Sequence, residues 1–243
     1  MGSFFVSSSI RREVGRAVGN YSMLHSGDNV LVGLSGGKDS VLLTLTLSEL
    51  RSRSPVKFSL SACMVIMDER VDIVSIKEFC SSMDVTLTTI FHPILDIIKK
   101  RNERSPCSFC ANMRRGILSG YAQKNNFNVL ALGHNLDDAV ETAYMNLFRA
   151  GRFKSFKPKF HQDRTNLWLI RPLIYVRESK IISEAARLEL PVLINSCDYA
   201  GNTERQKIKE FLKTMSSSVP DIHSNTLNAL KNLSDNDKWE NIE

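Results

Sequence analysis

The sequence predicts an α/β protein built on a doubly wound parallel sheet with helices on both faces. Apolar runs of strand length alternate along the chain with segments whose apolar residues recur at helical spacing. An early strand-like run passes through a glycine-rich turn directly into a helix, as nucleotide-binding α/β folds do. The chain has 243 residues, of which 42% are hydrophobic, and this is enough to bury one full core.

The expected elements follow the alternation in order. The first is a helix at 10–25, and a short apolar strand at 29–34 leads into the glycine turn. The later expected elements are a helix at 40–52, a strand at 58–67, a helix at 71–83, a strand at 85–91, a cysteine-bearing helical segment, a strand at 128–132, a helix at 137–148, a strand at 167–171, and helices at 178–188 and 203–215. We therefore divide the chain into an N-terminal helical segment (1–27), one catalytic domain with the cysteine segment inserted (28–200), and a C-terminal helical extension (201–243).

Composition narrows the class of protein. We find no apolar run of membrane length and no signal-peptide pattern, so we expect a cytoplasmic protein without a membrane partner. The net charge of +6 is concentrated in two basic segments, 99–115 and 149–164. Both suit contacts with a nucleic-acid backbone, and three phenylalanines interleave the second segment: Phe153, Phe156 and Phe160. A solvated lysine-rich surface is the alternative interpretation.

The glycine turn carries the strongest chemical signal. It reads Ser35, Gly36, Gly37, Lys38, Asp39 and Ser40. Two glycines permit close approach of the backbone to an anion, and the hydroxyls, the helix-start N–H groups and the lysine favour phosphate. A carboxylate beside a polyphosphate indicates a bridging cation, so Asp39 is our candidate magnesium ligand. The Walker spacing is absent, so transfer of the γ-phosphate is not implied. A simple glycine turn before a capped helix is the alternative.

A second loop is expected at the same edge of the sheet. It follows the strand at 128–132, and ligands of open parallel sheets bind beyond the carboxyl ends of the strands. Its candidate nucleotide-facing residues are Gly133, His134, Asp137 and Asp138. The two carboxylates also suit a role at the start of a helix, where they stabilise its positive end.

Five cysteines without a secretory signal argue against a disulfide framework. Cys63 and Cys80 lie in apolar runs and are expected in the core. Cys107 and Cys110 form a CxxC pair, the spacing of zinc, iron–sulfur and redox sites, and Cys197 is the candidate third ligand. No histidine stands at ligand-like spacing to complete a closed zinc site. Three cysteines suit a 4Fe-4S cluster with one open iron, whereas a merely buried Cys197 is the alternative.

Together these motifs make the chain resemble the TtcA-like tRNA 2-thiocytidine biosynthesis proteins, which are PP-loop enzymes of the N-type ATP pyrophosphatase superfamily. The matching stretches are LSGGKDS at 34–40, CSFCANMRRGIL at 107–118, the long stretch at 130–159, and IRPLIYVRESKI at 170–181. The resemblance implies an adenine nucleotide α-hydrolase-like fold, with a 4Fe-4S cluster on Cys107, Cys110 and Cys197. It also implies ATP and magnesium at the loop, a tRNA substrate, a cysteine desulfurase as sulfur source, and a homodimer.

The implied reaction makes 2-thiocytidine at position 32 of tRNA. The C2 oxygen of the base would attack the α-phosphate of ATP, with Lys38 and magnesium stabilising the phosphates, and sulfide would then displace AMP. Arg114 and Arg115 are candidates for holding tRNA phosphate or tuning the cluster. Relatives tend to carry a second CxxC-like pair around the third ligand, whereas only Cys197 stands here.

Several other functions stay open from the sequence. A cluster-dependent 2-thiouridine synthetase or a desulfidase of thiolated bases would share the same motifs. A lysidine synthetase would share the adenylation but needs no cluster. A non-catalytic tRNA- or zinc-binding module would have kept the motif only as a scaffold.

Overall fold

The structure is a computed structural model that describes residues 5–193, 199 and 203–233. Its contacts divide the described chain into two compact units. The first contains residues 5–135, 157–193 and 199, and the second contains 136–156 and 203–233. Each unit is described by itself below. The division into three segments made from the sequence stays a prediction.

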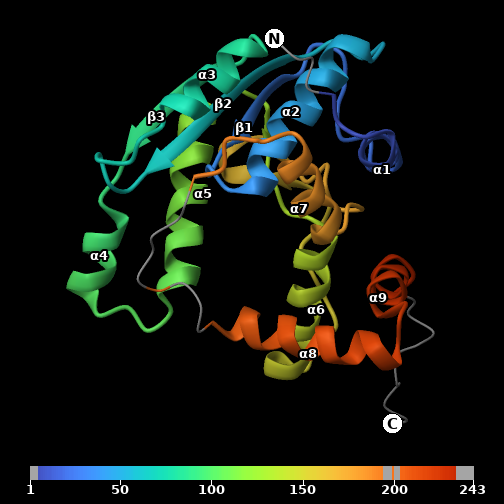
Figure 1. Cartoon of the computed structure of the whole chain (residues 1–243). Coiled ribbons are helices and arrows are strands. Elements are labelled where there is room, and N and C mark those ends of the chain that lie inside the picture. Colours follow the sequence, from blue (N-terminus) through green and yellow to red (C-terminus); the bar gives the residue numbers. More distant parts are fainter. Residues whose placement is uncertain (1–4, 194–198, 200–202, 234–243) are drawn as a thin grey trace. The chain divides into compact units, whose positions relative to one another are not determined.

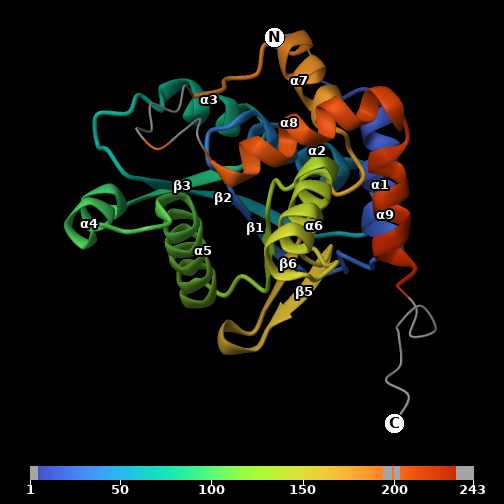
Figure 2. The same cartoon turned by 90° about the horizontal axis from the view of Figure 1, so that it is seen from below.

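The first unit is organised by a six-stranded sheet in the order β3-β2-β1-β4-β6-β5 (Figure 1). The strands are β1 (Asn29–Gly33), β2 (Ser59–Ile66), β3 (Thr86–Phe91), β4 (Val129–Ala131), β5 (Lys159–Gln162) and β6 (Leu167–Ile170). Four neighbouring pairs are parallel, and only β5 runs antiparallel to its partner β6. Figure 2 shows β5 beside β6 at this edge. The predicted doubly wound α/β class is confirmed, with one antiparallel edge strand added.

Helices cover both faces of this sheet. They are α1 (Ser8–Asn20), α2 (Lys38–Arg53), α3 (Val74–Ser82), α4 (Ile94–Arg101), α5 (Pro106–Lys124) and α7 (Glu178–Arg187). Figure 1 shows α2 and α3 on one face and α5 on the opposite face. Each parallel crossover needs such a helix because the chain must return to the amino edge of the sheet before the next strand begins.

Helix α2 is buried nearly all round over its first half, from Ser40 to Leu47. A helix that is apolar on every side is a core helix, and α2 packs against β1, β2 and α7. The strands it covers are continuous apolar runs, as expected of parallel strands that are buried on both faces. The helix that carries the glycine turn is therefore held firmly in place.

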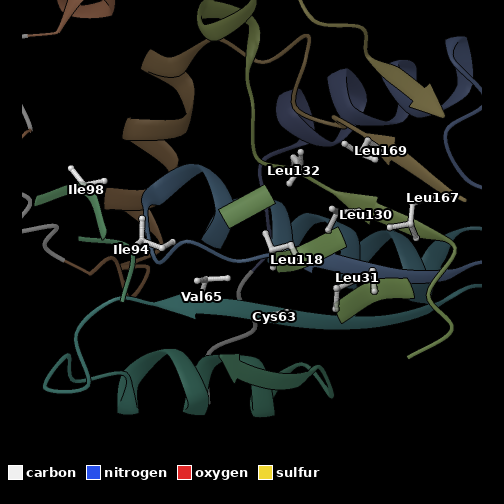
Figure 3. Close-up of a cluster of buried hydrophobic side chains, with 11 residues drawn as sticks. Leu31, Cys63, Val65, Ile94, Ile98, Leu118, Leu130, Leu132, Leu167 and Leu169 are labelled. Atoms are coloured by element: carbon white, nitrogen blue, oxygen red, sulfur yellow. The ribbon is translucent and has the colours of Figure 1, made fainter. Parts of the chain in front are cut away.

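The opposite face of the sheet holds the apolar cluster of Figure 3. Leu31 of β1, Leu130 of β4 and Leu169 of β6 stand in register across three parallel strands, and all three are buried. Leu118 and Ala122 of α5 pack against this row. Completely burying a leucine side chain stabilises the fold by about 1.5–3 kcal/mol, so the row anchors α5 to the sheet.

The second unit consists of helices. It contains α6 (Leu136–Ala150), α8 (Glu204–Ser218) and α9 (Ile222–Lys231). Its small core is formed by Leu136 and Val140 of α6 with Leu212 and Ile222. At its surface Tyr144, Phe148 and Phe211 form an aromatic cluster, with ring centroids 5.4–6.1 Å apart.

Three elements were not predicted from the sequence. The cysteine-bearing segment is two helices, α4 and α5, separated where Asn102 takes the left-handed conformation with φ 48°. Strand β5 lies in the basic segment 149–164, where alternating lysine and aromatic residues did not resemble a buried strand. Helix α9 lies in the predicted C-terminal helical extension but was not assigned as a separate helix, because its sequence is largely polar; it packs against α6 and α8. No helix in the described part of the chain is long and apolar enough to cross a membrane.

The fold makes one glycine indispensable. A Cβ added at Gly133, just after β4, would lie 3.0 Å from the amide nitrogen of Ser40 and 3.1 Å from the carbonyl carbon of Asp39. Both are backbone atoms at the start of α2, so neither can move aside cheaply. We expect Gly133→Ala to lower the free energy of unfolding by about 1–3 kcal/mol, measured by urea denaturation.

The matched control is Gly116→Ala on α5, where an added Cβ would meet nothing within 4 Å. Alanine is the better helix former, so this variant should unfold at the same urea concentration or a higher one. Equal stability of the two variants would show that the loop after β4 does not press on α2.

Candidate functional site

The glycine turn forms a loop closed on itself by two serines. The backbone N–H of Ser35 donates to Oγ of Ser40 at 3.0 Å, and the two Oγ atoms lie 2.9 Å apart. Oγ of Ser40 also donates to the carbonyl of Gly37 at 3.0 Å, and Gly36 takes φ +80°, which favours glycine. Gly37 is the N-cap of α2 and has no side chain to bond the first N–H groups of that helix. Those groups and the helix dipole make this loop suited to bind phosphate.

Lys38 begins α2 and lies between two carboxylates. Its Nζ is 3.0 Å from Oδ2 of Asp39 and 3.0 Å from Oε1 of Glu178, which stands in the first turn of α7. Burial alone lowers the pKa of Lys38, but the two carboxylates outweigh it, so its pKa is raised and the ammonium stays charged. The structure thus holds a fixed positive charge beside the loop.

Asp39 is held from both sides. In addition to Lys38, the side-chain amide of Asn135 donates to Oδ1 of Asp39 at 2.8 Å. Asn135 is buried and follows Gly133, whose close approach to the backbone of Asp39 and Ser40 brings the second loop to the start of α2. Carboxylate oxygens are ligands that magnesium prefers, so the chemistry of Asp39 suits the predicted ion.

Glu178 and Asn135 were missed from the sequence. Asn135 stands inside the predicted second loop, and its position directly after a parallel strand was the available signal. Glu178 is 140 residues from Lys38, and a carboxylate in the first turn of a helix has an ordinary structural role. Only the three-dimensional contact separates the two interpretations.

The second loop divides between the two units. Gly133 and His134 belong to the first unit, and His134 is half-buried there. Asp137 and Asp138 begin α6 in the second unit.

In that second unit both carboxylates have cationic or ionisable partners. Oδ1 of Asp137 lies 3.4 Å from Nε2 of His223, and Oδ1 of Asp138 lies 2.6 Å from Nη1 of Arg205. These pairs join α6 to α9 and α8. Asp137 and Asp138 therefore have structural partners, and their predicted contact with a nucleotide stays a prediction.

The CxxC pair lies on the first turn of α5. Pro106 is the first residue of the helix, and two residues separate Cys107 from Cys110, a spacing that places both on one side of the helix. Cys107 is exposed, and its Sγ lies 3.7 Å from the carbonyl oxygen of Tyr199. Cys110 is half-buried, with Sγ 3.7 Å from Sδ of Met67. The predicted core positions of Cys63 and Cys80 are confirmed, because both are buried.

Cys197, the predicted third ligand, lies outside the described residues. Its neighbour in sequence Tyr199 is described and contacts Cys107. Six residues earlier than Tyr199, the N–H of Leu193 donates to the carbonyl of Gly36 in the glycine turn at 2.9 Å. Six residues span at most about 20 Å, so one short segment links the glycine turn to the cysteine pair. Within the described ranges, no three His, Cys, Asp or Glu side chains are grouped to hold a metal ion.

Both parts of the site lie at the carboxyl edge of the sheet. The glycine turn follows β1, and Met67, which contacts Cys110, directly follows β2. These strands are parallel neighbours, with Gly33 paired to Cys63. Thiol sulfurs that share one side of a helix turn are the donors that iron–sulfur clusters use, so the pair fits the predicted cluster.

Comparison with known proteins places this arrangement in a family. Residues 6–215 match the family model described as a PP-loop domain. Two similar curated proteins are both named tRNA-cytidine(32) 2-sulfurtransferase. The protein from Pelobacter propionicus is 38% identical over 233 residues, covering 92% of this chain and 85% of its own length. The protein from Geobacter metallireducens is 38% identical over 231 residues, covering 92% and 89%.

The fold of this chain is also similar to that of a solved structure. It is the U34-tRNA thiolase NcsA from Methanococcus maripaludis with its 4Fe-4S cluster, which matches with a TM-score of 0.77 and 25% identity, covering 96% of this chain and 80% of that one. The chain belongs to the PP-loop family, among the relatives of the tRNA-cytidine(32) 2-sulfurtransferases.

Proposed function

We propose that this chain is an ATP-dependent tRNA sulfurtransferase that replaces the C2 oxygen of a tRNA cytidine with sulfur. The observation that carries the proposal is the common position of two chemically different groups. A phosphate-binding loop with a fixed lysine follows β1, and a cysteine pair packs against the residue that follows the neighbouring β2. The relatives named above act on tRNA cytidine by sulfur transfer.

The first half-reaction is activation of the base. The C2 oxygen attacks the α-phosphate of ATP, an O–P bond forms, and pyrophosphate leaves. The helix-start N–H groups and Lys38 stabilise the negative charge that develops on the phosphates. Asn135 and Glu178 keep Asp39 and Lys38 in position, so little reorganisation is needed when the nucleotide arrives.

The second half-reaction replaces oxygen by sulfur. The C–S bond forms, the C–O bond breaks, and the former C2 oxygen leaves as part of AMP. One ATP and one sulfide are therefore consumed for each thiolated base. When bound by Cys107, Cys110 and Cys197, a 4Fe-4S cluster supplies an iron without a protein ligand at which sulfide can be held. The chain's own contribution is to hold the thiols of Cys107 and Cys110 at the sheet edge that also carries the glycine turn.

The finer assignments belong to this proposal. Asp39 is the magnesium ligand, because its carboxylate is fixed at the loop and magnesium bridges carboxylates to phosphates. A cysteine desulfurase supplies the sulfur, and the protein acts as a homodimer. The basic segments 99–115 and 149–164 contact the tRNA backbone.

The test is an anaerobic assay with cluster-reconstituted protein, tRNA, ATP, magnesium and sulfide. AMP release is measured together with mass spectrometry of the nucleosides. Equal amounts of AMP and 2-thiocytidine are expected. Appearance of 2-thiouridine instead would make the protein a uridine thiolase, and formation of lysidine when free lysine is added would make it a cluster-independent enzyme. AMP without any modified base, or no AMP, would refute sulfur transfer.

Lys38 should be needed for the activation step. We expect Lys38→Met to lower kcat for AMP release by about 100-fold or more, because the charge on the departing pyrophosphate loses its fixed partner. The matched control is Lys57→Met. Lys57 is exposed near the amino end of β2, at the opposite edge of the sheet, and its Nζ bonds only the carbonyl of Ser54 among the contacts described. Similar rates for the two variants would remove Lys38 from the mechanism.

Thiol alkylation distinguishes the site cysteines from the core cysteines. Burial raises the pKa of Cys63 to about 12 and that of Cys80 to about 11, so near pH 8 both are protonated as well as inaccessible. We expect iodoacetamide to label exposed Cys107 in the folded apoprotein and to leave Cys63 and Cys80 unmodified until urea unfolds the chain.

Reconstitution with iron and sulfide provides the second arm of that experiment. Peptide mass mapping should then show Cys107 and Cys110 protected, while the two core cysteines are unlabelled in both states. Unchanged labelling of Cys107 after reconstitution would mean that this pair does not hold the cluster.

A further inference from the structure

Two adjacent arginines on α5 have different surroundings. Arg115 is exposed, and its Nη2 donates to Oδ1 of Asn112 at 2.8 Å on the same helix. Arg114 is half-buried and turns toward the site, where its Nη2 lies 3.4 Å from Sδ of Met67. The same sulfur lies 3.7 Å from Sγ of Cys110, one helical turn before Arg114. Arg114 therefore lies beside a ligand cysteine, and Arg115 does not.

Arg114 lacks a strong acceptor in the described structure. Its Nε is buried without a hydrogen-bond partner, and the only acceptor recorded for its Nη2 is a thioether, which accepts weakly. No ion pair to Arg114 occurs among the described residues. Asp68, next to Met67 in sequence, is already bound by Arg70 through Nε at 2.9 Å and Nη2 at 2.7 Å.

A half-buried guanidinium without an anion is costly to maintain. No carboxylate of the described residues offsets the cost of removing this charge from water. Buried hydrogen-bond donors nearly always have an acceptor in native proteins. Arginine retained under these conditions indicates that an anion lies beside it when the site is loaded. The orphaned Nε and the nearby Nη2 form a fork suited to receive it.

We infer that Arg114 binds the anionic sulfur donor, hydrosulfide, beside the cysteine pair and positions it for transfer to the activated base. This inference rests on the proposed function, because it names the residue that recognises the sulfur in that reaction. The surroundings favour sulfur over phosphate. The guanidinium contacts the sulfur of Met67, which in turn contacts the sulfur of Cys110, whereas phosphate has its own loop of hydroxyl and N–H groups at 35–40.

The test is a hydrosulfide titration of the anaerobic, cluster-reconstituted protein, followed by visible absorbance and repeated for two variants. Arg114→Met removes the donors, and Arg114→Lys keeps a charge without the fork. We expect the half-saturating hydrosulfide concentration to rise about tenfold or more in Arg114→Met and by a smaller factor in Arg114→Lys. The matched control Arg115→Met should give the wild-type hydrosulfide titration, because this titration contains no tRNA. In turnover, KM for sulfide should rise while KM for ATP stays constant.

A second measurement uses the apoprotein and needs no cluster. Removing a charge that has no partner should leave the Tm of Arg114→Met equal to the wild-type value or above it. A Tm lower by several degrees would make Arg114 a structural residue and overturn the inference.

Three other results would also overturn it. They are an unchanged hydrosulfide titration, loss of iron from Arg114→Met, and a change in KM for ATP instead of sulfide. Failure of the proposed function itself looks different, because wild-type protein would then release no AMP with tRNA or would hold no iron.

Discussion

Parallel pairing of β1 with β2 on one side and β4 on the other is the constraint on which the site depends. It brings the carboxyl ends of three strands to one edge, and each end carries a different group. The glycine turn follows β1, Met67 follows β2, and Gly133 follows β4. A shift of one residue in either pairing would turn every side chain of the shifted strand to the opposite face of the sheet and displace the group that follows it.

The close approach of Gly133 to the backbone at the start of α2 brings the loop after β4 against the glycine turn. Because no side chain intervenes, Asn135 can reach Asp39, and Asp39 in turn contacts Lys38. Glu178 completes the arrangement from α7. Lys38 is thus held by two carboxylates from separate helices, and the first of them is itself positioned by the neutral amide of Asn135. Preorganised charge of this kind stabilises developing negative charge more effectively than mobile side chains do.

The site also separates two kinds of chemistry along one edge. Hydroxyl, amide and ammonium groups line the phosphate end, whereas sulfur atoms and a guanidinium line the cysteine end. The first end therefore suits hard oxygen anions, and the second end suits soft sulfur. Leu193 contacts the first end at Gly36, and Tyr199, six residues later in the chain, contacts the second end at Cys107.

The fold class, most element positions and the glycine turn could be predicted from the sequence because the signals that define them are local. Strand and helix periodicity, two adjacent glycines and a CxxC spacing need no knowledge of distant residues. The prediction of individual elements was wrong where the local sequence signals are weak. The division of α4 from α5 depends on one left-handed asparagine, and β5 is a short basic strand at the sheet edge.

Tertiary structure alone decided how the motif residues are used. The sequence by itself identified a lysine, a carboxylate and a cysteine pair as candidates for this protein's chemistry. It did not determine that Lys38 pairs with Glu178, 140 residues away, or that Asp137 and Asp138 pair with His223 and Arg205. Nor did it distinguish Arg114 from Arg115, which are neighbours in the chain but lie in different surroundings. Each of these facts depends on which distant segments fold against one another. The local pattern of residues does not contain that information.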